Sequence, residues 1–204
     1  MLKKLAAEAL GISDIGKIMD PSDFNKVESD DYVMHEDGEK IYFLIKSKTD
    51  EYCFTNLALI HVDGTSAVSS KRLLKRYDYY QHSLSNVLLE TAGTMDLDVE
   101  IKFKMGEQSF SVDVDRKQLE KLKDLYKTLI KMSQMMQENN RMKSYRKSSL
   151  ETASKVLETM RAEESVISDE FKKLNEYVFD WQVESHRMYV RKDFGEVFER
   201  YINN

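Results

Sequence analysis

Short apolar runs separated by polar residues dominate the stretch from Lys40 to Asp63. The runs fall at residues 41–45, 52–54 and 57–62. They are rich in isoleucine, valine, phenylalanine and tyrosine, which favour a pleated strand, and each run is too short to form a helix. Short strands joined by polar turns predict an antiparallel meander, which must continue until its edges are paired or covered.

Strand patterns continue to about residue 114. Further strands are expected at residues 66–77, 79–82 and 86–91. The clearest pattern comes next, because apolar residues alternate with charged or polar ones over residues 97–105 and again over residues 109–114. Gly106 and Glu107 form the turn of this hairpin. We predict about seven antiparallel strands, the last two with one face directed to a core.

The hydrophobic period changes from two residues to about 3.6 at Asp115. Asp115 is expected to cap a helix, with Gln118 completing a capping box. The apolar face of this helix consists of Leu119, Leu122, Tyr126, Leu129 and Met136. Because such a face must be covered, we predict that the helix closes the open end of the strands. The expected fold class is α+β, a strongly bent seven-stranded antiparallel sheet closed by a helix and followed by a helical extension.

The chain from a predicted break at Asn139 and Asn140 onward indicates a helical tail. Its main apolar stripe consists of Phe171, Leu174, Val178, Trp181 and Met188. Asp193 and Glu196 are expected to begin a last short helix that carries Phe198. These stripes must be buried against one another, against the strands or against a second copy of the chain. So much apolar surface favours the second copy, and we predict that the main stripe and Phe198 form an oligomerisation surface.

Two other features are compatible with a membrane surface. A short N-terminal helix is expected to have one apolar face made by Leu2, Leu5, Ala9 and Leu10. This helix either packs on the protein or anchors it to lipid. A basic group on an expected strand consists of Lys71, Arg72, Lys75 and Arg76. These four residues are the candidate contact with anionic lipid.

The composition excludes several classes of protein. Of the 204 residues, 41% are hydrophobic and 33% are charged, which is typical of a folded globular chain. The net charge of −5 provides no general attraction for nucleic acid, so no nucleic-acid partner is expected. Cys53 is the one cysteine, which excludes an internal disulfide and favours a reducing compartment. We expect a cytoplasmic protein.

No arrangement of residues predicts catalysis or metal binding. The histidines at positions 35, 61, 82 and 186 are isolated, without a second ligand at a zinc-binding spacing. Cys53 lies in an apolar strand and is expected to be an inert core thiol. Asp193-Phe194-Gly195 matches the kinase metal motif, but neither a glycine-rich loop nor a catalytic-loop motif precedes it. We therefore expect neither an enzyme nor a bound cofactor or metal.

The strand region resembles a known family. The stretches DDYVMHEDGEKIYFLIKSKTDEYCFTNLALIHVDG and DLDVEIKFKMGEQSFSVDVDRKQLEKL are similar to the bacterial pleckstrin homology (PH) domain family. The tail resembles the YvbH-like extension that follows this domain in some Bacillus proteins. The resemblance implies a PH-like barrel, homo-oligomeric rings, a helical oligomerisation region and no catalytic activity. Lys40, Lys46 and Lys48 are only a loose match to the basic signature of phosphoinositide-binding PH domains.

The expected organisation is a bacterial PH-like domain over residues 1–138 and a helical oligomerisation extension over residues 139–204. Two functions are compatible with it. The first is a non-catalytic scaffold that assembles through barrel and tail and binds a protein partner, for example as a strand added to a sheet edge. The second is a peripheral membrane module that contacts anionic lipid weakly through the basic strand.

Overall fold

The computed structural model describes residues 15–64, 72–91, 98–158 and 164–202, which form two compact units. The first contains the described residues up to Ser133 together with those from Lys192 onward, and we call it the sheet unit. The second, Gln134–Arg191, is the hairpin unit. The predicted N-terminal helix lies outside the described residues.

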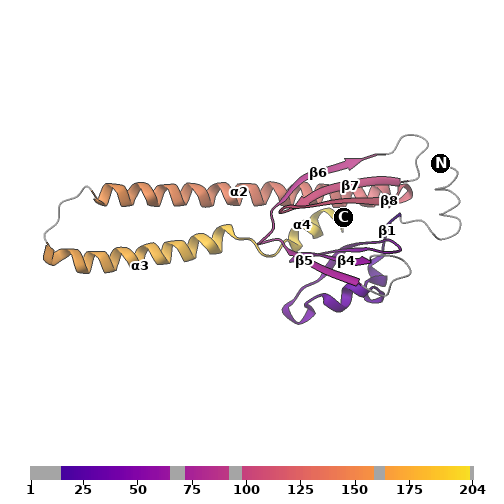
Figure 1. Ribbon diagram of the computed structural model, residues 1–204, viewed down its shortest axis with the longest axis horizontal. Helices are drawn as coiled ribbons and strands as arrows, with labels where there is room; N and C mark the ends of the chain where they lie inside the picture. Colours follow the sequence, from indigo (N-terminus) through magenta and orange to yellow (C-terminus); the bar gives the residue numbers. More distant parts are fainter. Residues whose placement is uncertain (1–14, 65–71, 92–97, 159–163, 203–204) are drawn as a thin grey trace. The chain divides into compact units, whose positions relative to one another are not determined.

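Two antiparallel sheets make up most of the sheet unit (Figure 1). The first sheet has the strand order β1 (Lys17–Ile18), β2 (Ile41–Lys46), β3 (Glu51–Thr55), β4 (Ala58–Gly64) and β5 (Arg72–Asp78). The second has the order β6 (Leu84–Glu90), β7 (Asp98–Met105) and β8 (Gln108–Asp115). Neighbours in each sheet are consecutive in the chain, so the predicted meander is confirmed.

The predicted closed barrel is wrong, because the two sheets remain separate and the described residues contain eight strands instead of about seven. On one side the sheets meet at Gly16, whose N–H donates to the carbonyl of Asp113 at 2.8 Å. A side chain at Gly16 would lie 2.6 Å from the Ile45 side chain, so only glycine permits this approach. On the other side, β5 and β6 are not paired with each other.

The predicted strand at residues 79–82 is a turn. The backbone N–H groups of Gln81 and His82 both donate to the carbonyl of Asp78 at 3.0 Å. The turn lets Tyr79 point inward, where its side chain is buried. An aromatic residue favours a strand, but here the turn bonds and the burial of one ring determine the local structure.

The first sheet is covered on both faces, which explains why β2, β3 and β4 contain runs of buried residues and not an alternation. Three 3₁₀ helices, η1 (Pro21–Lys26), η2 (Glu28–Tyr32) and η3 (His35–Asp37), lie between β1 and β2 in the chain. Val27 and Val33 from this segment pack with Leu44, Cys53 and Ile60 of the sheet. Asp20 caps η1 by accepting a 3.1 Å hydrogen bond from the backbone N–H of Ser22.

The second sheet contributes its alternating apolar face to the main core. Its buried residues are Val99, Ile101, Phe103, Met105, Phe110, Val112 and Val114. The rings of Phe103 and Phe110 stack with centroids 5.0 Å apart, and Phe54 from the first sheet lies 5.9 Å from Phe103. The predicted facing of this hairpin is confirmed, and the core lies between the two sheets.

The helix α2 (Leu119–Glu158) follows the short η4 (Arg116–Gln118), and side chains of both elements bond to the sheets. Asp115 accepts a 2.9 Å hydrogen bond from the backbone N–H two residues later, as predicted for a cap. Gln118 does not complete a capping box, because its amide bonds the N–H and carbonyl of Ile18 in β1 at 2.7 and 2.8 Å. Ser133 donates to the carbonyl of Leu84 in β6 at 2.8 Å. The predicted closing helix is confirmed.

The helix α2 continues without interruption through Asn139 and Asn140, where the sequence predicted a break. It enters the hairpin unit, whose second helix is α3 (Glu164–Tyr189). The final helix, α4 (Gly195–Ile202), belongs to the sheet unit. Asp193 caps it by accepting a 2.7 Å hydrogen bond from the N–H of Gly195, as predicted.

Candidate assembly surface on the helical hairpin

The hairpin unit consists of two helices whose sequences favour helix throughout. Neither α2 nor α3 contains glycine or proline, and α2 is rich in leucine, lysine and glutamate. The end of α2 and the whole of α3 lie side by side (Figure 1). Side chains are described for residues 134–155 and 172–191 of this unit.

Arg146 provides the principal described contact between the two helices. Its guanidinium lies 4.4 Å from the centre of the Trp181 ring and 5.7 Å from that of Tyr189. It also lies 3.7 Å from the carboxylate of Glu184 and donates to the sulfur of Met188 at 3.6 Å. Such a cation over an aromatic ring stabilises by about 0.5–2 kcal/mol, depending on its exposure. A charged side chain that lies on aromatic rings therefore connects the two helices. Two paired helices are usually joined by apolar side chains instead.

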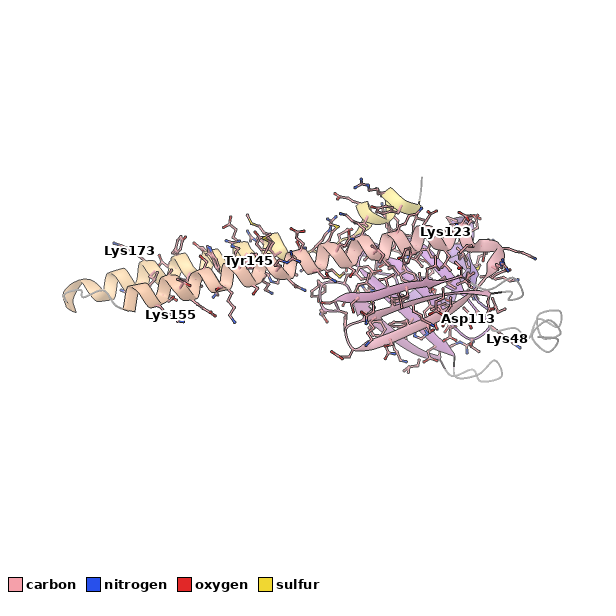
Figure 2. The ribbon with its side chains drawn as sticks, turned by 90° about the horizontal axis from the view of Figure 1, so that it is seen from above. Lys48, Asp113, Lys123, Tyr145, Lys155 and Lys173 are labelled. Carbon is pink, nitrogen blue, oxygen red and sulfur yellow. The ribbon has the colours of Figure 1, made fainter. Side chains whose placement is uncertain are left out.

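The hairpin unit has almost no hydrophobic core of its own. Among its described side chains, only Met136 and Ser185 are buried. The large apolar side chains that are exposed are Tyr145, Leu174, Tyr177, Phe179 and Met188 (Tyr145 is labelled in Figure 2). Tyr177 and Phe179 each expose 64% of their surface. Because amphipathic helices derive most of their stability from a covered apolar face, this surface is incomplete in a single chain.

An open groove with a volume of about 500 Å³ lies between α2 and α3. Leu150 and Trp181 provide its large apolar lining, and Lys143 and Lys147 line it from α2. Ser185, the buried polar residue of α3, also lines the groove. The groove therefore combines an apolar surface with positive charge.

The basic strand proposed as a lipid contact is β5, and its described basic side chains are engaged with carboxylates. Arg72 lies 3.3 Å from Glu28, and Lys75 lies 3.0 Å from Asp63. Lys71 lies outside the described residues. The described part of β5 is therefore largely neutralised within the protein and does not present a set of open cations.

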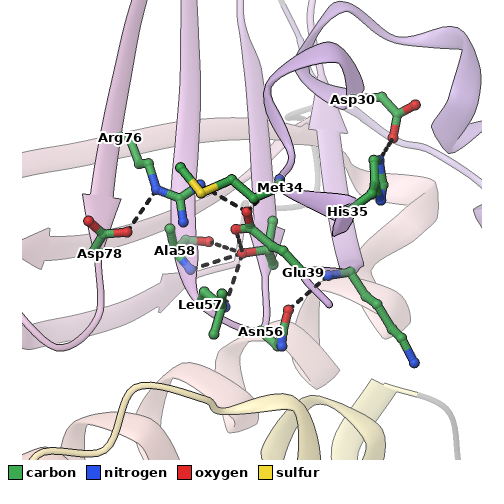
Figure 3. Close-up of polar contacts among 11 residues, drawn as sticks. Asp30, Met34, His35, Glu39, Asn56, Leu57, Ala58, Arg76 and Asp78 are labelled. Atoms are coloured by element: carbon green, nitrogen blue, oxygen red, sulfur yellow. Dashed lines mark hydrogen bonds and ion pairs between the residues drawn. The ribbon is translucent and has the colours of Figure 1, made fainter. Parts of the chain in front are cut away.

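Arg76 on the same strand is held more firmly. It pairs with Glu39 at 3.0 Å and with Asp78 at 2.7 Å (Figure 3). Burial alone raises the pKa of the Glu39 carboxyl, but hydrogen bonds from Arg76, Thr55 and the N–H of Met34 outweigh it and hold this pKa below its ordinary value. The pair is part of the internal architecture of the sheet unit.

The potentially reactive side chains of His35, His61 and Cys53 are hydrogen-bonded or buried within the sheet unit. His35 bonds Asp30 at 3.0 Å, and His61 bonds Asp50 at 3.0 Å. Burial raises the pKa of the Cys53 thiol to about 12. Within the described parts of the chain, no three histidine, cysteine or acidic residues gather into a group that could hold a metal ion. The same described residues contain no helix that is long and apolar enough to cross a membrane.

Comparison with known proteins finds two family descriptions, each matching a different part of the chain. Residues 9–133 match the family described as "Bacterial PH domain", and residues 144–204 match a "YvbH-like oligomerisation region". The chain belongs to the bacterial PH domain family. Neither description names a catalytic activity.

This bacterial PH domain protein has relatives that span its whole length. It is 57% identical over 204 residues to "Uncharacterized protein YvbH" of Bacillus subtilis (strain 168), which covers 100% of both chains. A crystal structure of a PH domain containing bacterial protein from Exiguobacterium sibiricum 255-15 is 51% identical, with a TM-score of 0.85. The alignment covers 93% of this chain and 100% of that one. The PH-domain fold with a helical extension is therefore shown.

In this bacterial PH domain protein, the residues that were predicted to form one oligomerisation surface differ in exposure and lie in both units. Leu174 and Met188 are exposed, whereas Val178 and Trp181 are half-buried. Phe198 is fully buried in the sheet unit, and the side chain of Phe171 is outside the described set. The sequence argument missed Tyr145, Tyr177 and Phe179, because they lie outside the regular apolar stripe. Their size alone was the available signal.

Proposed function

We propose that this chain is a non-catalytic interaction module that assembles with copies of itself through the hairpin unit. The observation that carries this proposal is the near absence of buried side chains in the described hairpin, together with the exposure of Tyr177 and Phe179. Two helices without a core of their own gain stability when a second copy covers their apolar side chains. Self-association provides this cover without a different protein partner.

Two further observations support self-association. Residues 144–204 match a region described by its oligomerisation, and this range contains all of α3. The hairpin is also tied to the sheet unit at both ends, since α2 begins there and the chain returns to it at Lys192. A double attachment reduces the freedom that the hairpin loses when it docks. Binding of a separate protein partner stays a prediction.

Light scattering on the full chain at several concentrations tests the proposal. The mass should be a multiple of the 23.9 kDa of one chain. The double variant Tyr177→Asp, Phe179→Asp should lower this mass, because it places charge on the two most exposed rings of α3. Leu88→Asp is the matched control, since Leu88 is also exposed but lies on β6 of the sheet unit.

A mass of 23.9 kDa for the unmodified chain at every concentration would overturn the proposal. So would an equal loss of mass in the hairpin variant and in the Leu88→Asp control. Circular dichroism of each variant verifies that its helices and strands are retained, so that a lower mass reports assembly and not unfolding.

A further inference from the structure

The groove of the hairpin unit has a regular arrangement of charge along one wall. Lys143 and Lys147 are four residues apart on α2 and both line the groove. Residues four apart on a helix share a face and are separated by about 6 Å along the axis. The 3.9 Å contact of Lys147 with Glu151 joins two exposed side chains and contributes little. The two ammonium groups therefore form a short basic row beside an apolar surface.

The helix α3 has a matching row of opposite sign. Glu176 and Asp180 are also four residues apart, and both are exposed. Phe179 lies between them in the chain and is exposed as well. Because Phe179 precedes the groove residues Gln182 and His186 by three and seven positions, it shares their face of α3 and continues the rim of the groove.

We propose that the groove of one copy is the binding site for α3 of a second copy, an inference that rests on the proposed function. Phe179 of the second copy enters the groove beside Trp181 and Leu150. Glu176 and Asp180 of that copy pair with Lys143 and Lys147, respectively. The equal spacing of the two charged rows makes both pairs possible at once, and pairing in this order requires the incoming α3 to run parallel to α2.

The arrangement is self-complementary. The described contacts of Arg146 near the start of the hairpin with Glu184 and Tyr189 near the end of α3 make the two helices antiparallel. An incoming α3 that runs parallel to α2 is therefore antiparallel to the α3 already present, which is the relation that a two-fold axis perpendicular to the helices produces. The groove of each copy then binds α3 of the other copy. The two hairpins form a four-helix arrangement in which Phe179 of both copies is covered.

Charge exchange between two full-length variants tests this docking. The first variant is Lys143→Glu with Lys147→Glu, and the second is Glu176→Lys with Asp180→Lys. Each alone places like charges together at both grooves and should self-associate about tenfold more weakly than the unmodified chain at low salt. An equimolar mixture should restore association, because every groove then faces a row of opposite charge. Analytical ultracentrifugation with one variant fluorescently labelled measures both quantities.

The control is Arg141→Glu with Lys155→Glu, which makes the same charge change on exposed residues of α2 that do not line the groove. It should associate like the unmodified chain. If the unmodified chain assembles but neither charge variant weakens it beyond the control, the groove proposal is overturned while self-association through the hairpin stands. Weakening of both variants without recovery in the mixture also overturns the pairing. A monomeric unmodified chain overturns the proposed function itself.

Discussion

The side-chain amide of Asn56 donates a 2.8 Å hydrogen bond to Asp193, 137 positions later in the chain. The backbone carbonyl of Asn56 also accepts from the N–H of Phe194 at 2.8 Å. Together these bonds attach the C-terminal segment to the turn between β3 and β4. The last helix, α4, therefore belongs to the sheet unit, although its Phe198 was predicted to be part of the oligomerisation surface.

The packing of α4 predicts a large loss of stability when Phe198 is truncated. Its ring is fully buried, 5.3 Å from that of Tyr42 and 6.4 Å from that of Tyr79. Phe198→Ala should lower the free energy of unfolding by about 3–5 kcal/mol. Glu196→Ala, at an exposed position of the same helix, should change it by less than about 0.5 kcal/mol. Urea unfolding measures both, and equal effects would contradict the placement of α4.

The Glu39–Arg76 pair predicts a specific acid sensitivity. Because the folded-state pKa of Glu39 lies below its ordinary value of 4.5, its contribution is fully present above that value and is lost as the pH falls through the folded pKa. Glu39→Gln should cost about 1–3 kcal/mol at neutral pH, since Arg76 loses a buried negative charge and retains Asp78. Below pH 4.5 the variant should lose less further stability than the unmodified protein.

Urea unfolding at a series of pH values from about 7 to 3 tests this sensitivity. Asp50 and Glu51 also have lowered pKa values, because hydrogen bonds outweigh their burial, and they remain in both proteins. Some acid sensitivity is therefore expected in the variant. Parallel stability curves for the two proteins over this range would contradict the assignment to Glu39.

The thiol of Cys53 should be unreactive in the folded protein. It is completely buried in β3, and burial raises its pKa to about 12, so the thiolate is scarce at ordinary pH. Iodoacetamide at about pH 8 should leave the native chain unmodified and should alkylate it fully in urea. Rapid alkylation of the native chain, detected by mass spectrometry, would show that the first sheet opens readily.

The contact between Arg146 and Trp181 should be visible in fluorescence, because Trp181 is the one tryptophan of the chain. Arg146→Ala should shift its emission to longer wavelength and destabilise the hairpin by about 0.5–2 kcal/mol. Arg146→Lys should restore little of either, because an ammonium lacks the planar face that lies on the ring. Arg141→Ala, at an exposed position of α2, is the matched control. Unchanged emission in Arg146→Ala would contradict this contact.

The amino-acid sequence by itself determined the local features of the fold. The alternation over residues 97–105 selects an inward face whatever lies opposite, because successive side chains of a strand point to opposite sides. Phe103 is accordingly buried and Lys104 exposed. The caps at Asp115 and Asp193 were equally predictable, since each carboxylate accepts from a backbone N–H only two residues away.

Only the tertiary structure decided which surface covers each apolar face. Hydrophobic burial is not directional, so the pattern around Phe198 is the same whether a second copy or the sheet unit covers it. Gln118 has the same hydrogen-bonding capacity toward its own helix as toward Ile18, and only the position of β1 selects Ile18. The separation of the two sheets likewise depends on long-range approaches such as that at Gly16.

The candidate assembly surface was also predictable in part from the sequence and in part only from the tertiary structure. Its apolar stripe was visible in the sequence because Leu174, Trp181 and Met188 recur at helical spacing. Phe179 lies outside that stripe, and its significance depends on the groove that α2 and α3 form beside it. The sequence determined which side chains require cover. Folding decided that the sheet unit buries Phe198 and that Phe179 stays exposed, because only one of them lies within reach of a complementary surface in the same chain.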